Sequence, residues 1–162
     1  MQKRTAFKLC LAGATAVALN AAPVAVFAKD EPLKVAFVYV SPANEEGWSS
    51  QHDIARKFVE EKFGDKIKVT WIENIPENAD AQRVIRDLAQ QGNKIIFATS
   101  FGYMNSVMKV AKQFPNVYFE HATGYKTSKN VKNYTARFYE GRYLAGMLAA
   151  ATTKTNILGY VA

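Results

Sequence analysis

Aromatic rings and hydrogen-bonding groups occur together in three short segments of the sequence. The segments contain Gly47 and Trp48; Ser100, Phe101 and Tyr103; and Glu120 and His121. An aromatic face beside a few polar groups suits a flat heteroaromatic ligand, which stacks on the ring and is oriented by hydrogen bonds to its edges. These residues are therefore predicted to contact a ligand.

The aromatic candidates also have a structural interpretation. Phe101 and Tyr103 could equally pack against the first turn of the helix that follows them. Binding is favoured for Trp48, because this large ring follows the flexible Gly47 and has no periodic apolar partner nearby. Trp48 is the stronger prediction.

Reactive side chains are sparse in this sequence. His52 and Asp53 fall in the first turn of an expected helix, where an acidic side chain favours the helix dipole. Glu120 and His121 are better placed, at the end of an expected strand, but two distant histidines are weak support for a metal site. Nucleophile-elbow, dinucleotide, phosphate-loop and His-Glu-x-x-His motifs do not occur. The sequence predicts no catalytic residues, no metal and no cofactor.

The expected position of Trp48 depends on the strand before it. Residues 34–40 form an apolar run typical of a strand buried on both faces, and Ser-Pro-Ala-Asn at 41–44 ends it. Ser49 or Ser50 is predicted to cap the next helix, and Trp48 is then expected in the preceding loop. The apolar stripe expected for that helix consists of Ile54, Ala55, Phe58 and Val59.

The chain continues as alternating strands and helices. Strands are predicted at 67–72, 94–99 and 117–120, and a helical stripe of Ala81, Val84, Ile85, Leu88 and Ala89 lies between the first two. This rhythm predicts an α/β fold: an open, flavodoxin-like parallel sheet with helices on both faces and strand one between strands two and three. Ligands bind such sheets at the carboxyl ends of the strands, where the three candidate segments would meet.

The last part of the chain is expected to extend the same sheet. We predict a fifth strand at 134–138, a helix at 139–152 that approaches the sheet through small residues, and a sixth strand at 157–161. The apolar stripe of that helix would consist of Leu144, Met147, Leu148 and Ala151.

Residues 1–28 have the composition of a secretory signal peptide. Three basic residues precede an Ala-rich apolar run, which is interrupted by Asn20 and Pro23, a poor pattern for a permanent membrane anchor. Cleavage is predicted after Ala28. The single cysteine, Cys10, lies near the start of the apolar run, so a lipoprotein is not expected, and the mature chain would contain no thiol.

The mature chain would have 134 residues, enough for one compact domain. Loss of the three basic residues of the signal segment lowers the net charge from +7 to +4. This charge is spread along the sequence, without the clustered basic face that nucleic-acid binding requires, so no nucleic-acid partner is predicted.

Five motifs together resemble the basic membrane protein family of substrate-binding proteins, which serve ABC importers. The resemblance covers residues 33–162, and its branch that binds purines such as adenine is the most similar. The motifs are Val-Tyr-Val-Ser-Pro-Ala-Asn-Glu-Glu-Gly-Trp, continuing to Asp53; Asn-Ala-Asp-Ala-Gln-Arg-Val-Ile-Arg-Asp-Leu-Ala from Asn78; Thr-Ser-Phe-Gly-Tyr-Met from Thr99; Phe-Glu-His-Ala-Thr-Gly-Tyr from Phe119; and Ala-Arg-Phe-Tyr-Glu-Gly-Arg-Tyr-Leu-Ala-Gly from Ala136.

The resemblance implies a type I periplasmic binding protein, in which two α/β lobes close on a nucleobase or nucleoside held between aromatic rings. It implies that Trp48 is the stacking ring, that Ser100 and Phe101 lie at the cleft, and that Glu120 and His121 lie near it. Residues 29–162 would be the N-terminal lobe, without the second lobe, which would supply many of the contacts that select one purine.

The implied function is that of a monomeric periplasmic receptor that delivers a purine to a membrane permease and catalyses nothing. The alternative is an exported flavodoxin-like sensor or enzyme that acts on a small aromatic ligand, with Asp53, Glu120 and His121 as its reactive groups.

Overall fold

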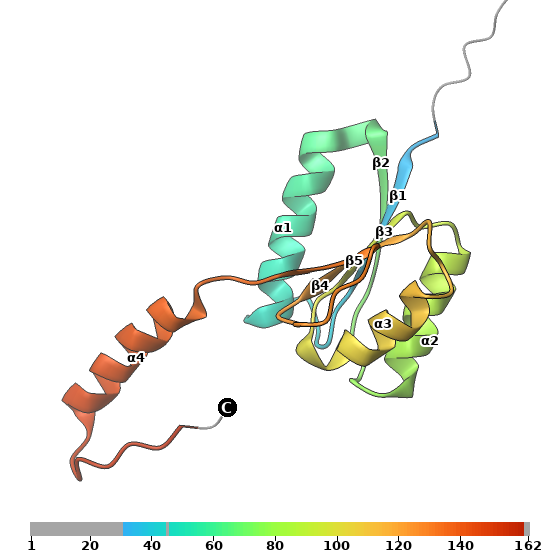
Figure 1. Ribbon diagram of the computed structural model, residues 1–162. Coiled ribbons are helices and arrows are strands. Elements are labelled where there is room, and N and C mark those ends of the chain that lie inside the picture. The colour runs from blue at the N-terminus through green and yellow to red at the C-terminus, as the bar shows by residue number, and fades with distance from the viewer. Residues whose placement is uncertain (1–30, 45, 161–162) are drawn as a thin grey trace, which may run out of the picture. The chain divides into compact units, whose positions relative to one another are not determined.

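The computed structural model describes residues 31–44 and 46–160 and contains a five-stranded sheet (Figure 1). Every pairing is parallel, and the strand order is β2-β1-β3-β4-β5. The strands are β1 (Leu33–Val38), β2 (Ile67–Ile72), β3 (Ile95–Ala98), β4 (Tyr118–Ala122) and β5 (Val131–Tyr134). The predicted parallel α/β fold is confirmed, with β1 between β2 and β3. The predicted signal peptide lies outside the described residues.

The helices are α1 (Trp48–Phe63), α2 (Ala79–Gln90), α3 (Met104–Ala111) and α4 (Phe138–Thr152), with short 3₁₀ helices η1 (Gly64–Lys66) and η2 (Phe101–Tyr103). Helices α2 and α3 cover one face of the sheet, and α1 lies on the other (Figure 1). None of the helices described is long and apolar enough to cross a membrane.

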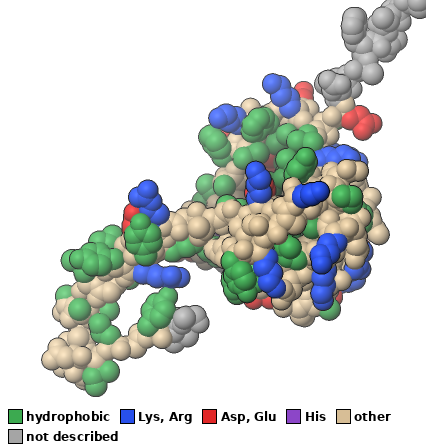
Figure 2. Space-filling model, in the orientation of Figure 1, with side chains coloured by type: hydrophobic (Ala, Val, Ile, Leu, Met, Phe, Trp, Pro, Cys, Tyr) green, Lys and Arg blue, Asp and Glu red, His purple; other side chains and the backbone are tan. Residues whose placement is uncertain are grey.

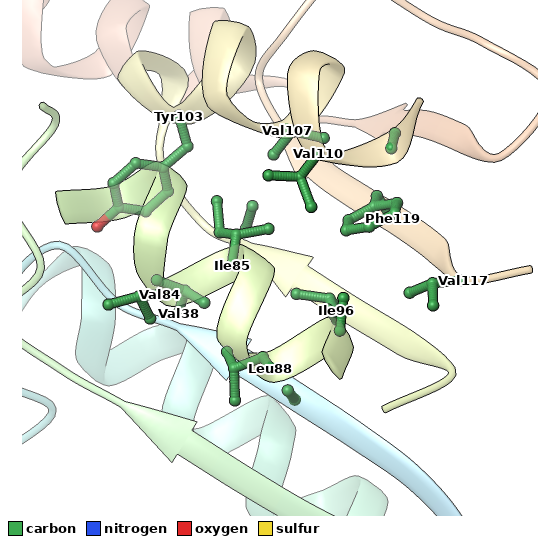
Figure 3. Packing of buried hydrophobic residues seen from close by; sticks show 14 of the residues in the cluster. Val38, Val84, Ile85, Leu88, Ile96, Tyr103, Val107, Val110, Val117 and Phe119 are labelled. Carbon is green, nitrogen blue, oxygen red and sulfur yellow. The ribbon is translucent and has the colours of Figure 1, made fainter. Parts of the chain in front are cut away.

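The main core lies between the sheet and the helix pair α2 and α3. The predicted stripe of α2 is confirmed, since all five of its residues are buried, and Asn78 caps this helix by accepting a hydrogen bond from the Asp80 amide at 2.8 Å. Ile85 and Leu88 of α2 pack near Ile96 of β3 (Figure 3). Burying each of these side chains contributes roughly 1.5–3 kcal/mol. The same core also contains Val38, Val107, Val110 and Phe119.

Helix α1 begins two or three residues earlier than predicted. Its first residue is Trp48, and Gly47 occupies the N-cap position without a side-chain cap hydrogen bond, so the predicted Ser49 or Ser50 cap is wrong. The Ser49 hydroxyl instead lies 2.8 Å from the Ser41 hydroxyl and accepts a hydrogen bond from the Ser41 amide. Trp48 therefore lies on a helix that is tied to the loop after β1, and not in the loop itself.

The predicted buried stripe of α1 is also wrong. Ile54 and Phe58 are 56% and 61% exposed, whereas Asp53 and Arg56 are buried. The two charges form an ion pair, with Arg56 Nε donating to Asp53 Oδ1 at 2.7 Å. Arg56 also lies 3.9 Å above the ring of Trp71 on β2. The polar side of α1 can face the protein because its charges are paired and the guanidinium is covered by an aromatic ring.

The lowered pKa of Asp53 predicts that the stabilisation from its ion pair depends on pH. Burial alone would raise the pKa of Asp53, but hydrogen bonds from Arg56 and Lys57 outweigh it and hold the pKa below its usual value. The stabilisation from a depressed carboxyl pKa is present above the unfolded-state pKa of about 4 and is lost as the pH falls through the folded-state pKa. We expect the stability gap between the wild type and Asp53→Asn to shrink between pH 7 and pH 3.

Urea unfolding at the two pH values measures this gap. Asp80→Asn is the control, because Asp80 forms an exposed ion pair with Arg83 at 3.0 Å. This substitution should change the free energy of unfolding by the same small amount at both pH values. An Asp53→Asn gap that stays constant from pH 7 to pH 3 would contradict the ionised pair.

The sheet face on the α1 side has an aromatic surface. Phe37 and Phe97 stack with their ring centroids 4.5 Å apart, and Tyr134 meets Phe97 edge-on at 6.3 Å. Ala55 and Val59, two members of the predicted α1 stripe, line a cavity of about 290 Å³ over these rings. The apolar side of α1 thus borders this cavity and solvent.

The end of the chain departs most from the sequence expectations. Strand β5 begins three residues before the predicted 134, and α4 has no buried residue. Leu144, Met147 and Leu148 are 65%, 55% and 67% exposed, so the predicted packing of this helix on the sheet is wrong; apolar side chains on its surface are visible in Figure 2. Residues 157–160 form no strand. A helix satisfies its own backbone hydrogen bonds, whereas a strand needs a neighbour, which these residues do not have in the described chain.

Candidate functional site

A largely apolar pocket of about 470 Å³ opens at the carboxyl edge of the sheet. The first two turns of α1, the ends of β4 and β5 and the start of α4 form its wall. Its lining residues are Gly47, Trp48, Gln51, His52, Ala55, Ala122, Thr123, Tyr134, Thr135, Ala136 and Phe138. This is the edge at which the sequence predicted ligand binding, and the volume suits a small planar molecule.

A hydrogen bond holds one edge of the Trp48 ring. Its indole Nε1 donates a hydrogen bond to the backbone carbonyl of Thr99, in the segment after β3. The ring lies 4.9 Å from the His52 ring and 5.6 Å from the Phe138 ring, between centroids, and both contacts are tilted. With 37% of the residue exposed, Trp48 presents an oriented aromatic surface at the pocket.

Gly47 determines how the chain enters this helix. Its φ of +119° is in a region that L side chains rarely adopt, although a Cβ added here would meet no atom within 4 Å. The requirement for glycine at this position is conformational. Gly47 thus sets the direction in which Trp48 leaves the loop.

The segment after β3 has one exposed and one buried aromatic ring. Phe101 is 53% exposed and lies beside Tyr125, with 6.4 Å between their centroids. Tyr103 is fully buried, and its hydroxyl donates to the Ile75 carbonyl at 2.5 Å. Burial, with a smaller contribution from Glu77, raises the pKa of Tyr103 well above its usual value. Tyr103 therefore packs within the fold, and Phe101 lies on an open surface hollow that Trp48 and Phe138 also line.

Ser100 contacts the loop after β2 and not the pocket. Its hydroxyl donates to the carboxylate of Glu77, which also accepts the Gly102 amide at 2.9 Å. A Cβ on Gly102 would lie 2.3 Å from the Glu77 carboxyl carbon, so a side chain here would displace the Glu77 carboxylate from its present position. Glu77 holds the start of η2 in place.

Glu120 and His121 lie on opposite faces of β4. His121 is 1% exposed, and its Nε2 lies 2.7 Å from the Ser100 carbonyl oxygen. Glu120 is half-buried in the cavity on the α1 side, next to Tyr134. Burial and the Glu120 charge raise the pKa of Tyr134. Neither Glu120 nor His121 lines the pocket around Trp48.

Of the sequence-predicted site residues, the structure brings Gly47 and Trp48 to the pocket and leaves the others around or beneath it. Phe138 was not among the predicted site residues, because the predicted fifth strand extended to that residue, whereas β5 ends at Tyr134. No binding role was predicted for His52, which lies one helical turn after Trp48 and lines the same pocket. The i, i+4 spacing of Trp48 and His52 was the available signal.

The polar chemistry of the pocket consists of hydrogen-bonding groups. Gln51, His52, Thr123 and Thr135 supply its polar side chains. Within residues 31–44 and 46–160 there is no group of three or more His, Cys, Asp or Glu side chains that could hold a metal ion. The arrangement suits stacking and hydrogen bonding to a neutral planar ligand.

Comparison with protein families gives one match to most of the chain. The family described as "ABC transporter substrate-binding protein PnrA-like" matches residues 33–162. A purine-binding protein of Brucella abortus (strain 2308) is 55% identical over 132 residues, which cover 82% of this chain and 38% of the relative. A Haloferax volcanii protein, provisionally named an ABC transporter glucose-binding protein, is 41% identical, with 82% and 33% covered.

Solved structures share the fold. A solute-binding protein of an ABC transporter system from Conexibacter woesei has a TM-score of 0.61 and 22% identity and aligns with 73% of this chain and 40% of its own. A solute-binding protein from Aeropyrum pernix K1 has a TM-score of 0.64 and 19% identity, with 74% and 32% covered. The chain spans 38% and 33% of the length of the two curated relatives described above.

Proposed function

Because the chain belongs to the PnrA-like family of ABC transporter substrate-binding proteins, we propose that it binds a purine base or nucleoside, such as adenine, and delivers it to a membrane permease. The Trp48 ring at the mouth of the apolar pocket is the observation that carries this proposal. Its indole edge is fixed by the Thr99 carbonyl, so a planar ligand meets a ring that is already oriented. The name of the Brucella relative supports the choice of a purine.

Phe138 is proposed as the second ring of the site. It lines the pocket and is the first residue of α4, four residues beyond the end of β5. The 5.6 Å between the Trp48 and Phe138 centroids is too short to admit a purine, which needs about 7 Å between flanking rings at ordinary van der Waals contact. Binding between the rings would therefore require α4 to move relative to α1.

We propose that the ligand is enclosed by two lobes, with residues 29–162 belonging to the N-terminal part. Two observations support this arrangement: the chain covers 38% of the Brucella relative, and α4 has no buried residue. In the two-lobed protein, the apolar side of α4 would pack in the second lobe, and residues 135–137 would link the lobes. Export to the periplasm as a monomer, with cleavage after Ala28, is part of the same proposal.

The alternative of a sensor or enzyme would require Asp53, Glu120 and His121 to act together. Asp53 is paired with Arg56 under α1, and Glu120 and His121 are on opposite faces of β4. The described structure therefore does not bring the three groups to one site, and no observation favours this alternative over the receptor.

Thermal unfolding in the presence of adenine, guanosine or glucose tests the proposed function. We expect one of the purines to raise the melting temperature in a concentration-dependent manner, because a ligand that binds only the folded state stabilises it. Glucose, suggested by the name of the Haloferax relative, should have no effect, and the purine should be recovered unchanged. Stabilisation by glucose alone, or chemical conversion of the purine, would contradict the proposal.

A further inference from the structure

A chain of hydrogen bonds runs beneath Trp48, along the carboxyl edge of the sheet. The Thr99 carbonyl accepts the indole N–H of Trp48, and the next carbonyl, that of Ser100, lies 2.7 Å from His121 Nε2. The other ring nitrogen, Nδ1, lies 3.3 Å from Oδ1 of Asn133 on β5. Two consecutive peptide groups therefore connect Trp48 to a buried side chain on β4.

Further hydrogen bonds fix Thr99 and Asn133, the residues on either side of the contact between Ser100 and His121. Thr99 is buried, and its amide and hydroxyl both donate to the Val38 carbonyl, at 3.2 and 2.8 Å. Asn133 donates to the Lys126 carbonyl at 3.0 Å, and its Oδ1 lies beside His121 Nδ1; a hydrogen bond there needs a proton on Nδ1 in addition to the one on Nε2. The Thr99–Ser100 segment is thus held by β1 on one side and by His121 of β4 on the other.

The loop after β4 closes over the His121 ring. A Cβ on Gly124 would lie 2.0 Å from His121 Nδ1, so the backbone can approach the ring only because this residue is glycine. With 1% of the residue exposed, His121 is not accessible to a ligand in the pocket.

We propose that His121 is a positioning residue for ligand binding. By donating from Nε2 to the Ser100 carbonyl, it fixes the segment whose preceding carbonyl anchors the indole of Trp48, and it does not contact the ligand. This inference rests on the proposed function, because the ring that is positioned is the proposed stacking surface.

Two amide substitutions separate positioning from packing. The side-chain nitrogen of His121→Gln can occupy the place of Nε2 and still donate to Ser100. The shorter side chain of His121→Asn reaches only the place of Nδ1 and leaves the Ser100 carbonyl without this donor. Both variants remove the ring, so a purely packing role predicts similar losses for the two.

The indole N–H resonances of Trp48 and Trp71 in NMR spectra of the chain provide a readout that does not require ligand. We expect His121→Asn to move the Trp48 resonance and to accelerate its hydrogen exchange, and His121→Gln to leave it near its wild-type position. Trp71 is the internal reference, because it lies on β2 beneath Arg56.

Adenine titration followed by NMR then measures the effect on binding. We expect His121→Asn to weaken binding about tenfold, as estimated for one unsatisfied buried carbonyl. His121→Gln should stay within about twofold of the wild type. Should His121→Asn fail to fold, Trp48→Phe removes the same anchor from the other side by deleting the indole N–H, and it should weaken binding about as much.

Equal losses of affinity in His121→Gln and His121→Asn with an unmoved Trp48 resonance would overturn the positioning role. The wild-type chain could bind no purine although His121→Asn moves the Trp48 resonance as expected. This result would refute the proposed function and, with it, the role of His121 in ligand binding. That outcome would leave the anchoring of Trp48 intact, so the two failures are distinguishable.

Discussion

Replacing Trp48 with alanine is expected to weaken purine binding by about ten- to hundredfold in a protein that carries this chain followed by a second lobe. Stacking one base on one aromatic side chain contributes about 1–3 kcal/mol, and each 1.4 kcal/mol changes the dissociation constant about tenfold. Isothermal titration calorimetry with adenine measures the change. The chain as described should bind weakly even with Trp48 present, because only one face of the base would be covered.

Melting curves of the same proteins separate binding from folding. Trp48 is 37% exposed at the mouth of the pocket and is not part of either buried core cluster, so its loss should lower the melting temperature by only a few degrees. Phe58→Ala is the control: this ring is 61% exposed on α1 and does not line the pocket, and its loss should leave affinity unchanged. Unchanged affinity in Trp48→Ala, together with a large drop in melting temperature, would show that Trp48 is a packing residue.

Replacing Asp53 with alanine is expected to lower the free energy of unfolding by about 3–5 kcal/mol, because it leaves the Arg56 charge buried without its buried partner. Arg56 is 3% exposed and also bonds to Glu60, which is itself partly exposed. Denaturant unfolding measures the loss.

Asp80→Ala provides the matched control for Asp53→Ala. Its carboxylate pairs with Arg83 at the surface of α2, with the same i, i+3 spacing as Asp53 and Arg56. The loss of an exposed pair should cost less than about 1 kcal/mol. Similar losses in the two variants would mean that burial of the Asp53–Arg56 pair has no energetic consequence.

The sheet and α2 could be predicted because each has a regular pattern. Apolar runs separated by helical stripes allow few alternatives to a parallel sheet, and the α2 stripe meets the sheet as its spacing requires. In α1, by contrast, the apolar stripe was assigned to the core, whereas the ion pair of Asp53 and Arg56 occupies that side. Periodicity shows that a helix has two faces, and it does not show that a charged face is internally paired.

The candidate site was predictable to the extent that topology fixes it. Because parallel strands present their carboxyl ends at one edge, Trp48 could be assigned to the ligand side of the sheet from the chain order alone. Alternation along β4 puts His121 on the face opposite Glu120, but its burial also depends on contact with the Ser100 carbonyl after β3, which the sequence does not reveal. Phe138 was missed because strand boundaries are poorly defined by composition.

Intermolecular NOEs between the chain and adenine test the stacking role of Trp48 most directly, since NMR detects weak complexes. We expect NOEs from the H2 and H8 protons of adenine to the ring protons of Trp48 and none to those of Trp71, which lies on β2 beneath Arg56. Binding of adenine with NOEs to Trp71 or to residues remote from the pocket, or the absence of any adenine NOE at millimolar concentrations, would contradict the proposal that Trp48 is the stacking surface for a purine.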